Sequence, residues 1–255
     1  GLLFTWRPDD AWSVGADFEW ADGYLVQFQE NPTEGSDFLV ETRPQGFHYD
    51  YDVRMLMFAA WAQWNHKINE KWILTAGLRG EVLSYDYSNN MLDGNTRDDG
   101  TECGFGGCLY TRPADRNDTF DNLAPELGLN VVLSDTTTLF ARLARGFRAP
   151  QATELYRLQR GQTVADLDSE TLDTIEIGLR GAGGRLYWDA ALFAMRKENG
   201  IFRDANGFNV SDGKTTHRGI EASLDWQFAE DWRFNANASY AKHEYDFDRP
   251  QSGIV

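Results

Sequence analysis

Apolar and polar residues alternate one by one along most of this chain. Between Trp12 and Trp20 every second residue is apolar, and the pattern returns between Trp232 and Tyr240. A period of two is typical of β-strands with one apolar face, whereas a helix repeats every 3.6 residues. Only Gln151–Arg157 suggests a helical turn. The sequence therefore predicts an all-β antiparallel meander of about ten strands. Between Phe47 and His66 both faces carry apolar residues, so a strand is predicted there without assigned faces.

The connections between the predicted strands alternate between short and long. Short connections fall near residues 8, 68, 135, 182 and 230, and long ones near residues 38, 103, 158, 206 and 248. The irregular stretch 199–213 is one of the predicted long loops. This segregation predicts one tight end and one elaborated end. Outer-membrane barrels show the same arrangement, with short periplasmic turns and long external loops.

Strand length and aromatic placement favour a membrane barrel over a soluble β-protein. Most apolar faces are about 9–11 residues long, the length that crosses a bilayer at a tilt. Aromatic residues make up 14% of the chain and recur next to short turns at Trp12, Trp72 and Trp232. Others lie near strand ends, at Trp20 and Tyr240, so both sets suit an aromatic girdle. The mean hydropathy of -0.53 does not oppose a barrel, because each strand is apolar on one face only.

The opposite face of the predicted strands carries charge. A soluble sandwich would expose that face to bulk water, whereas a large barrel would direct it toward a wet or plugged lumen. We predict that four charged residues on adjacent strands face the lumen or a plug within it: Glu126, Arg142, Glu176 and Arg180.

Charge and cysteine content narrow the class of partner and the compartment. The formal charge of -16, with no large basic patch, argues against a nucleic-acid partner. Cys103 and Cys108 lie in a Gly-rich segment and predict a small disulfide loop in an oxidising compartment; two free thiols are the alternative. The segment has no His, so a zinc site lacks ligands. We expect no metal site and no cofactor.

No catalytic constellation stands out, and we predict that the chain is not an enzyme. The rival is a complete small outer-membrane barrel acting as an enzyme or adhesin. Its local candidate for catalysis is His48 with Asp50 and Asp52, near the external end of one strand. We favour the interpretation that these three are solvated polar residues at the tip of a strand.

Several short motifs occur in order from residue 144 onward. They are Ala-Arg-Gly-Phe-Arg-Ala-Pro at 144–150, Glu-Leu-Tyr at 154–156, Leu-Asp-Ser-Glu-Thr-Leu at 167–172, Glu-Ile-Gly-Leu-Arg at 176–180, Asn-Gly-Ile at 199–201 and His-Arg-Gly-Ile-Glu at 217–221. This succession resembles the β-barrel of TonB-dependent outer-membrane receptors.

The resemblance implies a barrel of about 22 strands filled by an N-terminal plug. Such receptors lie in the bacterial outer membrane and import scarce nutrients, most often ferric siderophores, with energy passed on by TonB through the plug. Residues 1–255 would then be a partial barrel domain without the plug and the terminal strands. The implied partners are an iron-siderophore or similar small ligand, outer-membrane lipid and TonB.

One departure from the sequence pattern of haem receptors narrows the class of ligand. Phe147–Pro150 matches the first box of haem receptors, but Ala165–Asp168 replaces their Asn-Pro-Asn-Leu box and no His lies between the two. A siderophore is therefore expected first, ahead of cobalamin, carbohydrate, haem or another metal complex.

One predicted external loop gathers residues suited to an anionic ligand. Arginine offers charge-assisted contacts and aromatic rings offer flat packing. The candidate ligand-binding residues are Arg148, Tyr156, Arg157 and Arg160. For Arg148, pairing with a loop or lumen partner is the favoured role.

Overall fold

The fold is a single antiparallel sheet in which every strand pairs with its neighbours in the sequence. The structure is a computed structural model that describes residues 1–247. It orders ten strands consecutively, which confirms the predicted meander. The strands are β1 (Leu2–Trp6), β2 (Trp12–Gln29), β3 (Gly46–Lys67), β4 (Trp72–Asn89), β5 (Arg116–Ser134), β6 (Thr137–Arg148), β7 (Glu170–Gly183), β8 (Leu186–Arg203), β9 (Asn209–Ala229) and β10 (Trp232–Tyr245).

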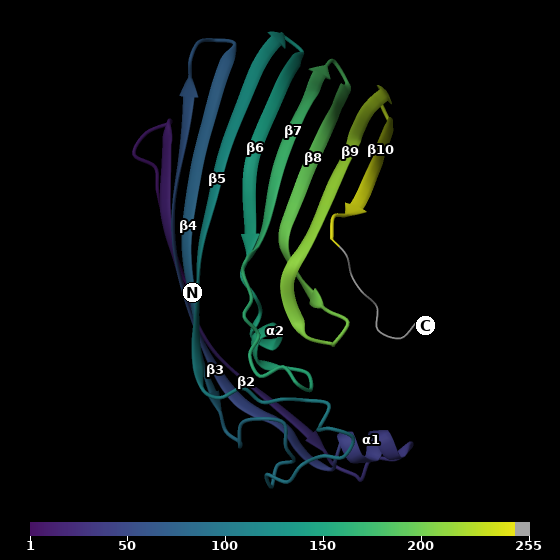
Figure 1. Cartoon of the computed structure of the whole chain (residues 1–255). Coiled ribbons are helices and arrows are strands. Elements are labelled where there is room, and N and C mark those ends of the chain that lie inside the picture. Colours follow the sequence, from purple (N-terminus) through teal and green to yellow (C-terminus); the bar gives the residue numbers. More distant parts are fainter. Residues whose placement is uncertain (248–255) are drawn as a thin grey trace.

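The two ends of the sheet differ as the loop lengths predicted; the predicted long connection near residue 248 lies outside the described residues. Figure 1 shows a curved sheet with the short turns at one end, and the long loops and both helices at the other. We call the second end the external end. β3 has 22 residues, about twice the 9–11 that cross a bilayer. The longest strands therefore continue well beyond the membrane on the external side. Within residues 1–247, no helix is long and apolar enough to cross a membrane.

The strand register places the apolar residues on one face, which we call the outer face. Phe18 lies opposite Phe58, and Phe58 lies opposite Val82. Farther along the sheet, Ile177 and Leu192 are paired in the same way. The side chain of Leu192 is 56% exposed although it is apolar. A continuous exposed apolar surface of this kind suits contact with lipid.

Charged pairs mark where the apolar band ends toward the external end. They lie on the outer face, where each follows a run of apolar residues on its strand. The pairs are Arg54 with Asp22 at 3.3 Å, Arg145 with Asp173 at 2.7 Å, and Arg218 with Glu244 at 2.8 Å. Since charges avoid the hydrocarbon core, we take this belt as the external boundary of the membrane-spanning segments.

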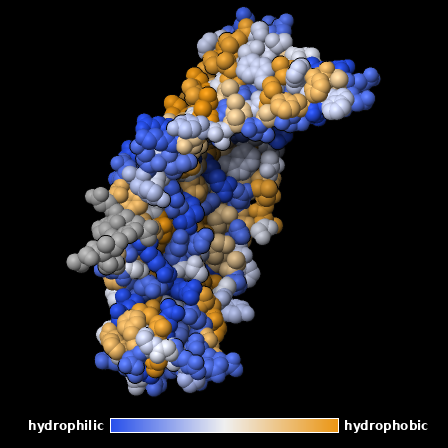
Figure 2. All heavy atoms as spheres, turned by 90° about the vertical axis from the view of Figure 1, so that its right-hand side faces the viewer, coloured by the Kyte–Doolittle hydropathy of each residue, from blue (hydrophilic) through white to orange (hydrophobic). Residues whose placement is uncertain are grey.

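The opposite, inner face carries mainly polar residues on the membrane-spanning segments. In the side view of Figure 2, hydrophilic residues fill the recessed middle of the visible face and hydrophobic residues lie along its flanks. In a closed barrel, such a face lines the lumen.

The ladder between β5 and β6 is incomplete. Its pairs end at Glu126 and Ala144, although both strands continue toward the external end. On β5, the next residue toward the external end is Pro125, and proline has no N–H with which to extend a ladder. The two strands separate there, and the chain that follows β6 turns toward the inner side of the sheet.

The structure corrects two predictions about loops. The loop 31–46 contains helix α1 (Asp37–Thr42), with Ser36 as its N-cap, where no helix was predicted. The predicted loop 199–213 is mostly strand, because β8 runs to Arg203 and β9 begins at Asn209. Gly200 and Gly213 face each other in this hairpin, and a Cβ on Gly213 would lie 2.7 Å from the Gly200 carbonyl oxygen. These glycines permit close backbone approach and do not end the strands.

The most buried residues lie at the external end. Two loops, the one between β4 and β5 and the one after β6, pack against the inner faces of β3 and β4. Together they form one apolar cluster, which includes Tyr49, Tyr51, Tyr87, Cys108, Leu155 and Tyr156. The external loops are therefore a packed unit.

Candidate functional site

The loop after β6 docks on the inner wall through one tyrosine. Helix α2 (Ala152–Tyr156) confirms the helical turn predicted there, and Tyr156 is fully buried. Its ring stacks on Tyr87 with ring centroids 4.3 Å apart, and it meets Tyr51 and Tyr85 edge to face. The hydroxyl donates to Asp118 at 2.8 Å. Burial, together with the Asp118 carboxylate, raises the pKa of Tyr156.

Charged hydrogen bonds hold the same loop at its start. A capping box links Gln151 and Glu154, with the Gln151 N–H donating to the Glu154 carboxylate at 2.7 Å. Arg148 donates to both oxygens of Glu154, at 2.9 and 3.1 Å, and to Glu170 at 2.6 Å. The planar guanidinium thus joins the end of β6, helix α2 and the start of β7, a task that suits arginine better than lysine.

Glu170 is the acceptor at the centre of this group. Besides Arg148, the Lys197 amine lies 2.8 Å away and the Ile201 N–H donates at 2.8 Å. Its side chain is 9% exposed. Burial alone would raise the pKa of Glu170, but these three donors outweigh it and lower the pKa to about 2. The group lies outside the membrane-spanning segments, beyond the belt pair Arg145–Asp173.

We expect Glu170→Gln to lower the free energy of unfolding by about 1–2 kcal/mol at neutral pH, because the variant loses charge-assisted hydrogen bonds but keeps the shape. The folded pKa lies below the ordinary value of 4.5. The carboxylate's contribution is therefore complete above that value and is lost as pH falls from about 4.5 to about 2. Denaturant unfolding of both proteins at pH 7 and at pH 3 checks this. A gap between them that stays constant at both pH values would contradict it.

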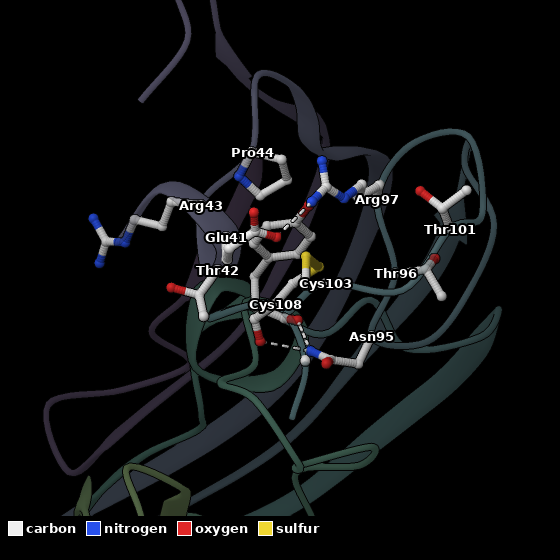
Figure 3. The surroundings of a disulfide bond; sticks show 12 residues. Glu41, Thr42, Arg43, Pro44, Asn95, Thr96, Arg97, Thr101, Cys103 and Cys108 are labelled. Carbon is white, nitrogen blue, oxygen red and sulfur yellow. Dashed lines mark hydrogen bonds and ion pairs between the residues drawn. A yellow bond between two sulfur atoms is a disulfide. The ribbon is translucent and has the colours of Figure 1, made fainter. Parts of the chain in front are cut away.

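The long loop between β4 and β5 is fixed by a disulfide and by one buried arginine. Cys103 and Cys108 are joined, and Cys108 is fully buried. Figure 3 shows the disulfide beside α1, with Arg97 directed toward Glu41, 3.2 Å away, and Arg43 directed away from it. The Asn95 amide donates to the backbone carbonyls of Cys108, at 2.8 Å, and of Tyr110.

Arg112 is 1% exposed, and sequence reasoning missed it. Its guanidinium donates to the carbonyl oxygens of Leu92 at 2.6 Å, His48 at 3.3 Å and Thr96 at 2.9 Å. A buried cation surrounded by carbonyl oxygens organises backbone that no ladder satisfies. Its acceptors come from distant segments, so no local sequence pattern indicated its role.

Removing the disulfide through Cys103→Ser with Cys108→Ser is expected to loosen this loop without unfolding the sheet. A loop this short contributes about 2 kcal/mol by restricting the unfolded chain. Limited proteolysis should cut the segment between β4 and β5 faster in the variant, while strand signals in circular dichroism stay unchanged. Equal cleavage rates in the oxidised protein and the variant would contradict the expectation.

The four predicted ligand-binding residues do not form one surface. Tyr156 is buried under its own loop, so its ring is not available to a ligand in this arrangement, and Arg148 is engaged with Glu154 and Glu170. Arg160 donates to the Phe105 carbonyl at 2.8 Å and lies over the Phe38 ring. Only Arg157 combines an exposed side chain with a single hydrogen bond among those described, donating to Gln27 at 3.0 Å.

Arg157 borders a small recess on the inner side. This cavity of about 280 Å³ is lined by Thr153, Glu154, Arg157, Ile201, Phe202, Arg203 and Asn209. Two arginines and a mixed apolar and polar lining suit an anionic group or one edge of a larger anionic molecule.

The structure brings together three of the four predicted lumen-facing charges. Arg142 donates to Glu126 at 2.8 Å and lies directly opposite Glu176 in the register. Arg180 is farther along the strand, over the Phe140 ring, and donates to Asn130 at 2.5 Å. All four side chains lie on the inner face of the sheet.

His48 does not assemble with its acidic neighbours. Its Nε2 lies 2.8 Å from the Pro44 carbonyl oxygen, and its ring stacks on Tyr110 at 4.5 Å. Burial lowers the pKa of His48. Asp50 and Asp52 instead accept hydrogen bonds from Asn90, at 3.2 and 2.8 Å. These contacts give the three residues structural partners.

The sequence matches one family model over nearly its whole length. The model, described as the β-barrel of TonB-dependent receptor-like proteins, covers residues 2–254. The ferric-pyoverdine BN7/BN8 receptor of Pseudomonas putida is 28% identical over 124 residues, which is 46% of this chain and 14% of that protein.

Solved structures of similar fold cover almost the whole chain. The copper transporter OprC aligns over 95% of this chain and 37% of its own, with a TM-score of 0.66 and 17% identity. The ferric-catecholate import receptor Fiu from E. coli K12 aligns over 96% of this chain and 37% of its own, with a TM-score of 0.65 and 20% identity. The chain thus spans well under half the length of these proteins.

Proposed function

Because this chain belongs to the TonB-dependent receptor-like β-barrel family, we propose that it forms part of the wall of an outer-membrane receptor that imports a ferric siderophore. The observation that carries the proposal is the family match over residues 2–254, together with a relative named as a ferric-pyoverdine receptor. Proteins of this family lie in the bacterial outer membrane, and the described relatives are transport receptors. We propose accordingly that the chain is not an enzyme.

The two faces of the sheet support a role in passage across the membrane. The outer face offers an apolar band to lipid, and the inner face offers polar and charged side chains to a wet interior. The external loops form a packed unit above this interior. A ferric siderophore is a bulky and often anionic molecule, and Arg157 is an exposed cation in the loop after β6.

We propose that the inner ion pairs face a plug domain in the intact receptor. Arg142 with Glu126 and Glu176 forms a group that can trade partners with charges on a second surface. In this proposal the barrel has about 22 strands and the plug carries the contact with TonB. This chain supplies consecutive strands of the wall.

The test is uptake of radioactive iron by cells that lack the chromosomal gene and carry the full-length receptor on a plasmid. Ferric pyoverdine, a ferric catecholate and ferric citrate are supplied separately under iron limitation. We expect uptake of one of them to depend on the receptor and to stop when TonB is inactivated. Arg157→Ala should reduce that uptake severalfold, whereas Arg7→Ala, at the opposite end of the sheet, should not.

Receptor-dependent uptake of cobalamin or a carbohydrate, with no uptake of any ferric siderophore, would contradict the proposed substrate. The receptor would then import another class of nutrient. Uptake that continues without TonB would contradict energised transport. Folding of the receptor is checked separately through heat-modifiable mobility on gels.

A further inference from the structure

Two histidines that are far apart in the sequence meet on the inner face near the external end. His217 of β9 and His243 of β10 are directly paired in the register. Their Nδ1 atoms are 2.6 Å apart, and the ring centroids are 4.9 Å apart. The two nitrogens thus lie within hydrogen-bonding distance of each other. Both residues lie just beyond the belt, on the face opposite Arg218 and Glu244.

A methionine lies beside this histidine pair on the same face. Met195 of β8 is directly opposite His217. Side chains opposite each other in a ladder have Cβ atoms about 4.5–5.5 Å apart. The thioether can thus reach the point at which the imidazoles converge. Lys197, the next residue on the inner face of β8, has its amine 2.8 Å from Glu170.

Thr215 orients one of the two rings. Its hydroxyl oxygen lies 2.9 Å from Nε2 of His217. When that nitrogen carries the proton and donates to Thr215, Nδ1 presents a lone pair toward His243. A second hydrogen bond of this kind is the usual support of a metal-binding histidine, because it fixes the tautomer and the ring orientation.

We propose that His217, His243 and Met195 form a copper-binding site on the inner wall. Metal–nitrogen bonds of about 2.0–2.1 Å at tetrahedral angles place two ligand nitrogens roughly 3.3 Å apart. The observed 2.6 Å has to widen by less than 1 Å, which side-chain rotation supplies. Imidazole with a thioether favours copper over iron, and Cu²⁺ binds nitrogen donors more tightly than the other divalent first-row ions.

This donor set is not one for a ferric siderophore, whose iron is already wrapped by its own ligands. The described residues contain no group of three or more His, Cys, Asp or Glu side chains arranged for a metal ion. In the proposed site the sulfur of Met195 is the third donor, and water completes the coordination. The inference does not rest on the proposed uptake function, since failed siderophore transport would leave the copper site intact.

The experiment measures copper binding to the full-length receptor in detergent micelles. Competition with a chromogenic chelator gives affinities for Cu²⁺, Zn²⁺ and Cu⁺, and electron paramagnetic resonance detects nitrogen coupling to Cu²⁺. His217→Ala and His243→Ala should each weaken Cu²⁺ binding at least tenfold and remove coupling to one nitrogen. Met195→Leu should weaken Cu⁺ binding about tenfold and change Zn²⁺ binding less than threefold, because thioethers prefer Cu⁺.

The matched control is His66→Ala, which removes a histidine from the opposite end of the sheet and should leave affinity and coupling unchanged. Heat-modifiable mobility shows that each variant folds. If an alanine variant fails to fold, the asparagine variant replaces it and the same loss is expected. Unchanged Cu²⁺ affinity in the His217→Ala/His243→Ala double variant overturns the site. A loss of Cu²⁺ affinity in only one of the two single variants also overturns the proposed site, because a shared ion needs both rings.

Discussion

Replacing Arg112 by Lys is expected to be among the most destabilising single changes in the external loops, at about 3–5 kcal/mol. The guanidinium donates to carbonyls of two segments, the loop between β4 and β5 and the start of β3, and is almost fully buried. Lysine keeps the charge but has a single nitrogen at the tip of its side chain, so several buried carbonyl oxygens lose their donor. Hydrogen exchange should show lost protection of amides between β4 and β5 and at the start of β3.

Arg97→Lys is the matched control for Arg112. Arg97 lies in the same loop, but its ion pair with Glu41 is solvent-exposed. A change of less than about 1 kcal/mol is expected, as for other surface pairs. If the amides of the loop are as well protected from hydrogen exchange in the Arg112→Lys variant as in the Arg97→Lys variant, then the buried arginine does not organise the loop.

A lysine on the outer face should cost far more than a lysine next to it on the inner face. Leu192 and Ala191 are neighbours on β8. Leu192 lies between Ile177 and Ile220, and Ala191 lies opposite Glu221. Leu192→Lys places a charge in lipid and is expected to destabilise the folded receptor by about 2–4 kcal/mol. Ala191→Lys meets a carboxylate on the polar side, and a change within about 1 kcal/mol is expected.

Reversible unfolding of the two lysine variants in lipid vesicles measures this difference. Equal destabilisation would mean that the two faces have the same surroundings, and a larger cost for Ala191→Lys would reverse the assigned faces. The comparison is closely matched because both variants introduce the same charge at the same depth in the membrane.

The alternation of residues predicted the strands and their faces because it is a local signal with a fixed period. The register then follows from the tight turns, and it also pairs residues equally far from a turn, such as His217 and His243. The positions of the two histidines relative to this turn can therefore be read from the sequence.

The site was less predictable because its contacts join distant segments. Tyr156 is a plausible ligand-contacting residue when only its own loop is considered. Its burial depends on Tyr51 and Tyr87, which place aromatic rings on a face that is otherwise polar. Arg112 binds backbone carbonyls, which every residue carries, so the pattern of side chains does not indicate this contact. Helix α1 is a single short turn in a polar loop, too short for a helical period to appear.

The central claim is that the apolar face of this sheet meets lipid and the polar face meets the interior of an outer-membrane barrel. Nitroxide labels placed singly at residues 189–196 of β8 in the full-length receptor test it most directly. The two cysteines of this chain are paired in the disulfide, so they do not compete for the label. In membranes, we predict that collisions with oxygen, which dissolves in lipid, peak at Ala190, Leu192 and Ala194 and fall at Ala191, Phe193 and Met195. Oxygen accessibility without a period of two, or with maxima at the odd positions, would contradict the account.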